Sequence, residues 1–464
     1  MEPAVSPNPE CPRCRELEQK IAQLEARLRD LEQKLEAALR SGKRQAAPFR
    51  KVGGPKLQPK PPGRKSGDDH GTHAHRATPA PESVTEFIDV PLPKQCDHCH
   101  SHDIAPSPEP EQQYQTEIPR IPLVRRFDIH VGTCRGCGHK VRGRHALQTS
   151  QATGAASHQL GPHAHAAITV LNKEMGLSHG KVSAVFRQLF GITIARSTSA
   201  RSQERTALVC QSAYEQIRQT LRESTHSHCD ETGWRVGGKS AWLHVFVTRE
   251  ATCYVVDPTR SAQPALQLFG HEYAGTMGHD GWSTYQKFLH AHHQQCLTHI
   301  LLRCKELREM LSYHTSWLAR RLSSIFKQSL QWRDEHPQAS ASVREAMVWD
   351  YVQQVGELTD GTTRYRHPEN RKLAQFVWNH ITEWFRFLLD PLTSASNSAA
   401  EQAVRPAAVN RKVWGGNRTW NGAVRQGVLS SILRTLWQRS LDTLDFLAQA
   451  RCSPRPLLIP NLQN

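Results

Sequence analysis

Three acidic residues that lie far apart in the sequence have the types and settings that divalent-metal chemistry requires. Asp230 lies in the aromatic run HCDETGWRV, Asp280 ends the segment YAGTMGHD, and Glu401 lies in SNSAAEQAVR. Three carboxylates can hold two hard divalent cations about 4 Å apart, one generating the attacking hydroxyl and the other stabilising the leaving oxygen. We therefore predict that Asp230, Asp280 and Glu401 are catalytic and are ligands of Mg²⁺ or Mn²⁺.

Glu231, next to Asp230, is the weaker candidate ligand. Side chains alternate between the two faces of a strand, so only one of these two acids can point the same way as the strand's other inward residues. The alternative for either acid is a solvated or hydrogen-bonded residue at a strand edge. We predict that Asp230 is the functional one.

The elements expected around these acids alternate in a recognisable order. Strands are expected at HCDETGWRV, AWLHVFVT and TCYVVD, with Gly237-Gly238 as the tight turn between the first two. Helices expected at AQPALQLF, STYQKFLHAH and THILLRCKELREML then alternate with short strands, and Glu401 lies in a helix opened by Ser396 or Asn397. This order matches a ribonuclease-H-like α/β core.

We predict a multidomain α+β protein whose catalytic core covers residues 223–440, followed by a tail at 441–464. Helix-like clusters such as LAQFVWNHITEWFRFLL indicate a helical insertion at about 311–390. A helical region at 155–222 precedes the core, and its helices have the size that helix-turn-helix modules use. An ordinary set of amphipathic helices explains that region equally well.

The chain is strongly basic, with 59 Lys and Arg against 43 Asp and Glu and a formal net charge of +16. Such a surplus favours a polyanionic partner such as nucleic acid, the alternative being a merely soluble basic protein. Several cations follow Glu401 in the sequence. They are expected to lie where a phosphate backbone passes, the alternative being an ordinary solvated face. We predict DNA contacts at Arg405, Arg411, Lys412 and Arg418.

Two CxxC pairs, CDHC and CRGC, have the spacing of a structural zinc site. We predict a zinc-ribbon domain at 85–147 in which four thiolates hold Zn²⁺, although a nearby histidine (His98, His100 or His139) could replace one thiolate. The alternative is two accidental pairs of reduced cysteines. The predicted ligands are Cys96, Cys99, Cys134 and Cys137.

The N-terminal region, 1–40, has the a/d spacing of a short leucine-zipper coiled coil, which indicates a homo-oligomer. The seam consists of Leu17, Ile21, Leu24, Leu28, Leu31, Leu35 and Ala38. The preceding Cys11 and Cys14 form a CPRC pair whose metal binding stays open.

The region at 41–84 reads as a basic flexible linker. Arg64 and Lys65 in PPGRKSG are candidate DNA contacts, with a solvated linker as the alternative. The chain also lacks an apolar run near the roughly 20 residues of a membrane span and begins without the apolar core of a signal peptide. We therefore expect a cytoplasmic, nucleoid-associated protein.

Several motifs in this order resemble the bacterial insertion-sequence transposases of the sixty-six type, the TnpC proteins. The resemblance rests on DETGWRVGGKSAW, GHDGWSTY, QCLTH and NSAAEQAVRPAAVNRKVWGG behind a zipper, a GRKSG linker and a double CxxC, and it spans nearly the whole chain. It implies a DDE-type transposase whose two Asp and one Glu fall on Asp230, Asp280 and Glu401. The chain departs from the family pattern at Ser398, where Asn is usual, and at Gln402, where Arg is usual.

The resemblance also places a Cys-x-x-His motif on Cys296 and His299, which the residues alone explain as core packing with one hydrogen bond. We expect these two residues to position substrate or shape the cleft. The implied partners are the terminal inverted repeats of an element, target DNA and small accessory proteins of the same element. The alternative function is a non-catalytic, zinc-binding DNA-binding protein, either a decayed copy or a regulator.

Overall fold

The computed structural model describes residues 19–21, 23–28, 31, 78–105, 107, 112–116, 122–152, 159–361 and 365–462. These residues belong to two compact units, one within 1–50, 124–188 and 192–464 and the other within 51–123 and 189–191. Outside the described residues lie the Cys11–Cys14 pair, the candidate DNA contacts Arg64 and Lys65, and the predicted zipper positions Leu17, Leu35 and Ala38.

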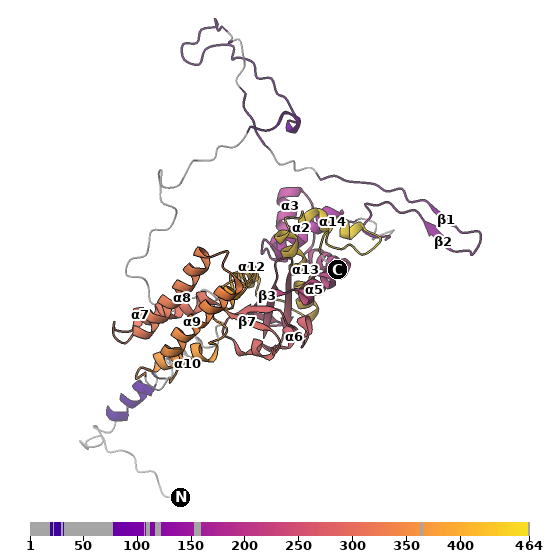
Figure 1. Cartoon of the computed structure of the whole chain (residues 1–464). Helices are drawn as coiled ribbons and strands as arrows, with labels where there is room; N and C mark the ends of the chain where they lie inside the picture. Colours follow the sequence, from indigo (N-terminus) through magenta and orange to yellow (C-terminus); the bar gives the residue numbers. More distant parts are fainter. Residues whose placement is uncertain are drawn as a thin grey trace, which may run out of the picture. The chain divides into compact units, whose positions relative to one another are not determined.

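A five-stranded mixed sheet forms the centre of the larger unit (Figure 1). Its strands are β3 (His226–Val236), β4 (Lys239–Val247), β5 (Thr252–Asp257), β6 (Thr276–His279) and β7 (His292–Gln295), in the order β5-β4-β3-β6-β7. Neighbours are antiparallel from β5 to β3 and parallel from β3 to β7.

The β3–β4 hairpin forms because Gly237 and Gly238 both adopt positive φ, at 59° and 78°. A two-residue turn with positive φ at both positions matches the right-handed twist of the strands that it joins. The turn sets the register in which Asp230 pairs with Val245 and Glu231 with His244.

The two faces of the sheet pack against different helices, which separates the two neighbouring acids. On one face, Cys229 and Phe246 share a core with α5 (Gln211–Glu223), α6 (Gln263–Phe269) and part of α13 (Trp420–Gln438). On the other face, Trp234 and Val245 pack against α12 (Ser398–Trp414). Because side chains alternate along β3, Asp230 faces α12 and Glu231 faces the opposite core.

A second apolar core lies among the helices that interrupt the sheet region between β7 and α12. Cys304, Phe326 and Trp384 are among its fully buried residues. These helices are α7 (Leu297–Met310), α8 (Trp317–Glu335), α9 (Ala341–Thr359), α10 (Pro368–Asn379) and α11 (Arg386–Leu389), and α8 to α11 fall within the region where an insertion is predicted.

Among residues 159–462, four α-helices precede the sheet, and one follows α13. They are α2 (Pro162–Lys173), α3 (His179–Phe190), α4 (Arg196–Val209) and α5, then α14 (Thr443–Cys452). Helix α2 packs against α4 and α14, and α5 packs against β5 and α13. Earlier in the sequence come the short 3₁₀ helix η2 (Pro81–Ser83), in the smaller unit, and the antiparallel pair β1 (Val131–Thr133) and β2 (Lys140–Arg142).

The prediction of one α-helix is wrong. The segment STYQKFLHAH, expected to be helical, contains only the short 3₁₀ helix η4 (Ser283–Lys287) before β7 begins at His292. The chain must return here to pair parallel with β6 after a short crossover, which leaves little length for a regular α-helix. No helix among the described residues is long and apolar enough to cross a membrane.

Candidate active site

Parallel pairing of β3 with β6 brings Asp230 and Asp280 together at the edge of the sheet formed by the carboxyl end of β6. The pairing matches His226 with Thr276 and His228 with Gly278. Continuing this register by two residues sets Asp230 level with Asp280, the residue directly after β6. Backbone amides hold both carboxylates, since Glu231 N donates to Asp230 Oδ1 at 2.8 Å and Trp282 N donates to Asp280 Oδ1 at 3.1 Å.

Glu401 reaches the same edge from the first turn of α12. The helix is attached to β3 at its N-cap, where Asn397 Nδ2 donates to the Cys229 carbonyl at 2.8 Å. The buried residues Ala400 and Val404 on either side of Glu401 pack in the core that contains Trp234 of β3. Helix α12 therefore presents Glu401 near the face of β3 that carries Asp230.

The three predicted acids lie within electrostatic reach of one another. Burial raises the pKa of Asp230 to about 8, and the carboxylates of Glu231, Asp280 and Glu401 contribute to the increase. Like charges in a desolvated site disfavour further ionisation unless a cation compensates them. The oxygen donors and this deficit of positive charge both fit a divalent cation.

Glu231 already has cationic and hydrogen-bonding partners on the other face of the sheet. Arg260 Nε donates to Glu231 Oε1 at 2.8 Å, and the Tyr285 hydroxyl donates to Oε2 at 2.9 Å. The Glu231 side chain is only 1% exposed. The guanidinium of Arg260 also stacks on Trp282, 4.3 Å from the ring centroid. Glu231 is thus engaged in a structural contact.

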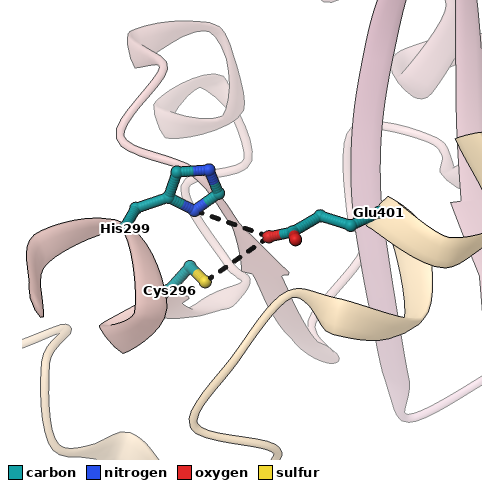
Figure 2. Close-up of side chains that lie close together, drawn as sticks. All are labelled: Cys296, His299 and Glu401. Atoms are coloured by element: carbon teal, nitrogen blue, oxygen red, sulfur yellow. Dashed lines mark hydrogen bonds and ion pairs between the residues drawn. The ribbon is translucent and has the colours of Figure 1, made fainter. Parts of the chain in front are cut away.

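Cys296 and His299 meet the carboxylate of Glu401, as Figure 2 shows. Cys296 is the N-cap of α7 and His299 lies in its first turn. Cys296 Sγ lies 3.9 Å and His299 Nδ1 lies 3.6 Å from Glu401 Oε1. Each of the three side chains offers one ligand atom, and these atoms all lie within 4.8 Å of one another. Sequence reasoning missed this group because the third member lies 105 positions beyond Cys296.

The cysteine and histidine of this group favour their charged forms. Burial opposes ionisation of Cys296, but hydrogen bonds from His299 and from the backbone amide of Asn397 lower the pKa of its thiol. The hydrogen bond to Cys296 and the nearby negative charges of Glu401 and Asp280 raise the pKa of His299 to about 9, against the effect of burial. An imidazolium therefore lies beside the acids, next to a thiol that ionises more readily than an ordinary cysteine.

The predicted DNA-contacting cations lie along α12 and in the loop that follows it. Arg405, Lys412 and Arg418 are exposed, and Arg411 is half-buried. Burial and the neighbouring Arg235 lower the pKa of Arg411. Arg235, at the exposed end of β3, is a further cation that sequence reasoning did not single out; Asn417 N donates to its carbonyl at 2.9 Å.

Each of the two CxxC pairs forms the same local turn. The amide of His100 donates to the Cys96 carbonyl at 2.9 Å, and the amide of Gly138 donates to the Cys134 carbonyl at 2.8 Å. The two donor residues both have positive φ, at 59° and 72°. Cys96 and Cys99 belong to the smaller unit and Cys134 and Cys137 to the larger one. The four-thiolate site stays a prediction.

Hydrogen bonds within each turn favour the thiolate form that metal binding requires. Backbone hydrogen bonds involving Cys99 and His98 lower the pKa of the Cys96 thiol. Backbone hydrogen bonds involving Cys137 and Gly136 lower the pKa of Cys134 in the same way. The first cysteine of each pair thus ionises more readily than an ordinary thiol.

The family model described as Transposase IS66 family matches residues 157–425. The matched region begins just before α2 and ends within α13, so it includes the sheet, the three predicted acids and the Cys296–His299 pair. A search of the curated proteins found no significant match.

Proposed function

The chain belongs to the Transposase IS66 family, and on this premise we propose that it is a DDE-type DNA transposase. It binds the ends of an insertion sequence, cleaves a phosphodiester bond there and joins the freed strand to target DNA. The observation that carries the proposal is the placement of Asp230, Asp280 and Glu401, from three separate elements, at one edge of the sheet.

The strand order supports a ribonuclease-H-like core. The central strand β3 carries the first acid, the parallel neighbour β6 leads directly to the second, and α12 brings the third after the helical insertion. Ligand sites in sheets with parallel strands form where the carboxyl ends of those strands meet. Asp280 occupies such a position at the end of β6.

The proposed chemistry divides between the metal ions and the chain. Asp230, Asp280 and Glu401 would hold the ions. Two bound Mg²⁺ or Mn²⁺ ions supply activation of the attacking hydroxyl and stabilisation of the leaving oxygen. Asp230 would lose its proton on becoming a ligand, because a bound cation would offset the burial and the neighbouring negative charges that raise its pKa. The imidazolium of His299 adds positive charge at the same edge.

DNA binding is proposed along the basic residues that surround α12. Arg405, Lys412 and Arg418 would contact phosphates of the element ends or of the target DNA, and Arg235 extends this surface. Phosphate contacts orient a protein on DNA without reading its sequence. The N-terminal coiled coil and the zinc ribbon are proposed to supply oligomerisation and additional DNA binding.

The decisive experiment is cleavage of a DNA duplex that carries the end of the element, in the presence of Mg²⁺ or Mn²⁺. Asp280→Ala should abolish cutting and joining while DNA binding, measured by gel shift, persists. Asp334→Ala serves as the matched control because this acid is exposed on α8. Equal cutting by Asp280→Ala and the parent would overturn the assignment. DNA binding without any metal-dependent cleavage by the parent would instead select a non-catalytic DNA-binding protein.

A further inference from the structure

We propose that Cys296, His299 and Glu401 form a binding site for a borderline transition-metal ion, Zn²⁺ in the first instance, which competes with the catalytic ions for Glu401. The binding itself follows from the geometry and chemistry of these three side chains. Its inhibitory effect rests on the proposed function.

The distances between the donor atoms suit a small tetrahedral ion. With metal–ligand bonds of about 2.0 to 2.3 Å, the ligand atoms of tetrahedral zinc lie about 3.3 to 3.8 Å apart. In the protein, Glu401 Oε1 lies 3.6 Å from His299 Nδ1 and 3.9 Å from Cys296 Sγ. All three ligand atoms lie within 4.8 Å of one another, so side-chain adjustments of about 1 Å are enough to complete the site.

The donor set selects the class of metal. One sulfur, one imidazole nitrogen and one carboxylate oxygen form a mixed set that suits Zn²⁺ and similar ions, whereas Mg²⁺ prefers oxygen ligands alone. Three protein ligands also leave a fourth position for water, as in catalytic zinc sites. The site therefore discriminates between Zn²⁺ and the Mg²⁺ expected on the three acids.

The ligands are held in place by contacts outside the group. The Asn397 amide donates to Cys296 Sγ at 3.1 Å, and the side chain of Asn397 is anchored on the Cys229 carbonyl at 2.8 Å. The backbone around Cys296 is fixed too, since its amide donates to the His279 carbonyl at 3.0 Å. Such outer contacts orient metal ligands and strengthen binding.

The group is accessible from solvent even though its sulfur is buried. Cys296 is 3% exposed, whereas the side chains of His299 and Glu401 are 51% and 33% exposed. An ion can thus enter past the imidazole and the carboxylate. Because Glu401 belongs to both sites, an ion held by Cys296 and His299 draws this carboxylate away from Asp230 and Asp280.

Binding is tested on the full chain after removal of metal, with Co²⁺ as a spectroscopic probe. Thiolate-bound Co²⁺ gives a charge-transfer band in the near ultraviolet and strong visible bands when it is tetrahedral, and added Zn²⁺ should remove both. Cys296→Ser should lose one equivalent of Co²⁺. Cys134→Ser, the control for the predicted ribbon, should keep that equivalent.

His299→Ala provides a second variant that leaves the Cys296 sulfur and its amide contact in place. It should weaken Co²⁺ binding at this site at least tenfold, with circular dichroism confirming that each variant is folded. Unchanged Co²⁺ stoichiometry and spectrum in both Cys296→Ser and His299→Ala would overturn the proposal.

The competition is tested by titrating Zn²⁺ into the Mg²⁺-dependent cleavage reaction, each protein being compared with its own zinc-free rate. The concentration of Zn²⁺ that halves this rate should rise at least tenfold in Cys296→Ser. Equal inhibition of the parent and of Cys296→Ser would show that Zn²⁺ at this site does not compete with the catalytic ions. If the parent protein binds this equivalent of Co²⁺ but never cleaves DNA, the proposed function is wrong and the proposed metal site is retained.

Discussion

Adjacent acids on β3 acquire opposite surroundings because they point to opposite faces of the sheet. Asp230 faces α12, and burial raises its pKa, with further contributions from the carboxylates of Glu231, Asp280 and Glu401. Glu231 is buried against Arg260 and Tyr285, which supply a cation and a hydroxyl donor. A single step along the strand thus separates a candidate metal ligand from a structural anion.

Neutral replacements of these two acids should therefore have different consequences. Asp230→Asn is expected to lower metal-dependent cleavage at least ~10³-fold, equivalent to about 4 kcal/mol in the barrier. Glu231→Gln keeps the shape of the side chain, so cleavage should stay within tenfold, but it should cost about 1–3 kcal/mol of stability because Arg260 loses its charged partner. Cleavage rates and urea unfolding measure the two effects. Loss of cleavage in Glu231→Gln alone would reverse the assignment.

At the scale of elements, a buried lysine joins three helices. Lys173 ends α2; its Nζ donates to Gln426 of α13 at 2.7 Å and lies 5.4 Å from the ring centroid of Trp414 of α12. Its backbone carbonyl accepts a hydrogen bond from Asn410 of α12 at 2.6 Å. Burial, and then the charge of Arg425, lower the pKa of Lys173 to about 7.

This depressed pKa predicts a pH-dependent stability. An unfolded lysine titrates near pH 10.5, so between about pH 7 and 10.5 only the unfolded chain binds the proton, and stability rises with pH. Lys173→Met removes this dependence, because it retains the apolar stem without the charge. Its stability relative to the parent should be highest near pH 6 and fall by at most about 1.4 kcal/mol per pH unit above pH 7.

Urea unfolding at several pH values measures the difference. Lys305→Met is the matched control, since Lys305 is 67% exposed on α7 and its replacement should show little pH dependence. A difference between Lys173→Met and the parent that stays constant from pH 6 to 9.5 would contradict the prediction.

At the scale of the whole molecule, the described part of the N-terminal region presents apolar residues to solvent. The described residues there, 19–21, 23–28 and 31, are helical. Four residues of the predicted zipper seam are more than half exposed: Ile21, Leu24, Leu28 and Leu31. Burial of such a stripe against another helix is the usual source of coiled-coil stability.

Charged residues in this seam should therefore break the predicted oligomer. The Leu24→Glu and Leu28→Glu double variant is expected to reduce the mass measured by light scattering to that of one chain. The matched control is the Glu25→Gln and Arg27→Gln double variant, which alters neighbouring polar positions of the same helical segment. An unchanged mass in the leucine variant would show that another surface carries the assembly.

Local sequence patterns were sufficient to predict the elements that carry the acids. The glycine pair 237–238 indicates the hairpin, strand alternation separates Asp230 from Glu231, and the run of strands and helices indicates the order around β3. These features depend on neighbours in the sequence, whose φ preferences and hydrophobic periodicity can be read directly. The 3₁₀ turn of η4, where a longer helix was expected, reflects the short return to β7 instead.

Long-range packing decided what surrounds each acid. The register of β3 against β6 sets Asp230 level with Asp280. Helix α12 brings Glu401 to His299 and to Cys296, which lies 105 positions earlier in the sequence. Arg260, in the loop between β5 and α6, likewise meets Glu231 across 29 positions of the sequence. Periodicity shows which side of an element is buried, but the partner that covers it is selected by packing of the whole core.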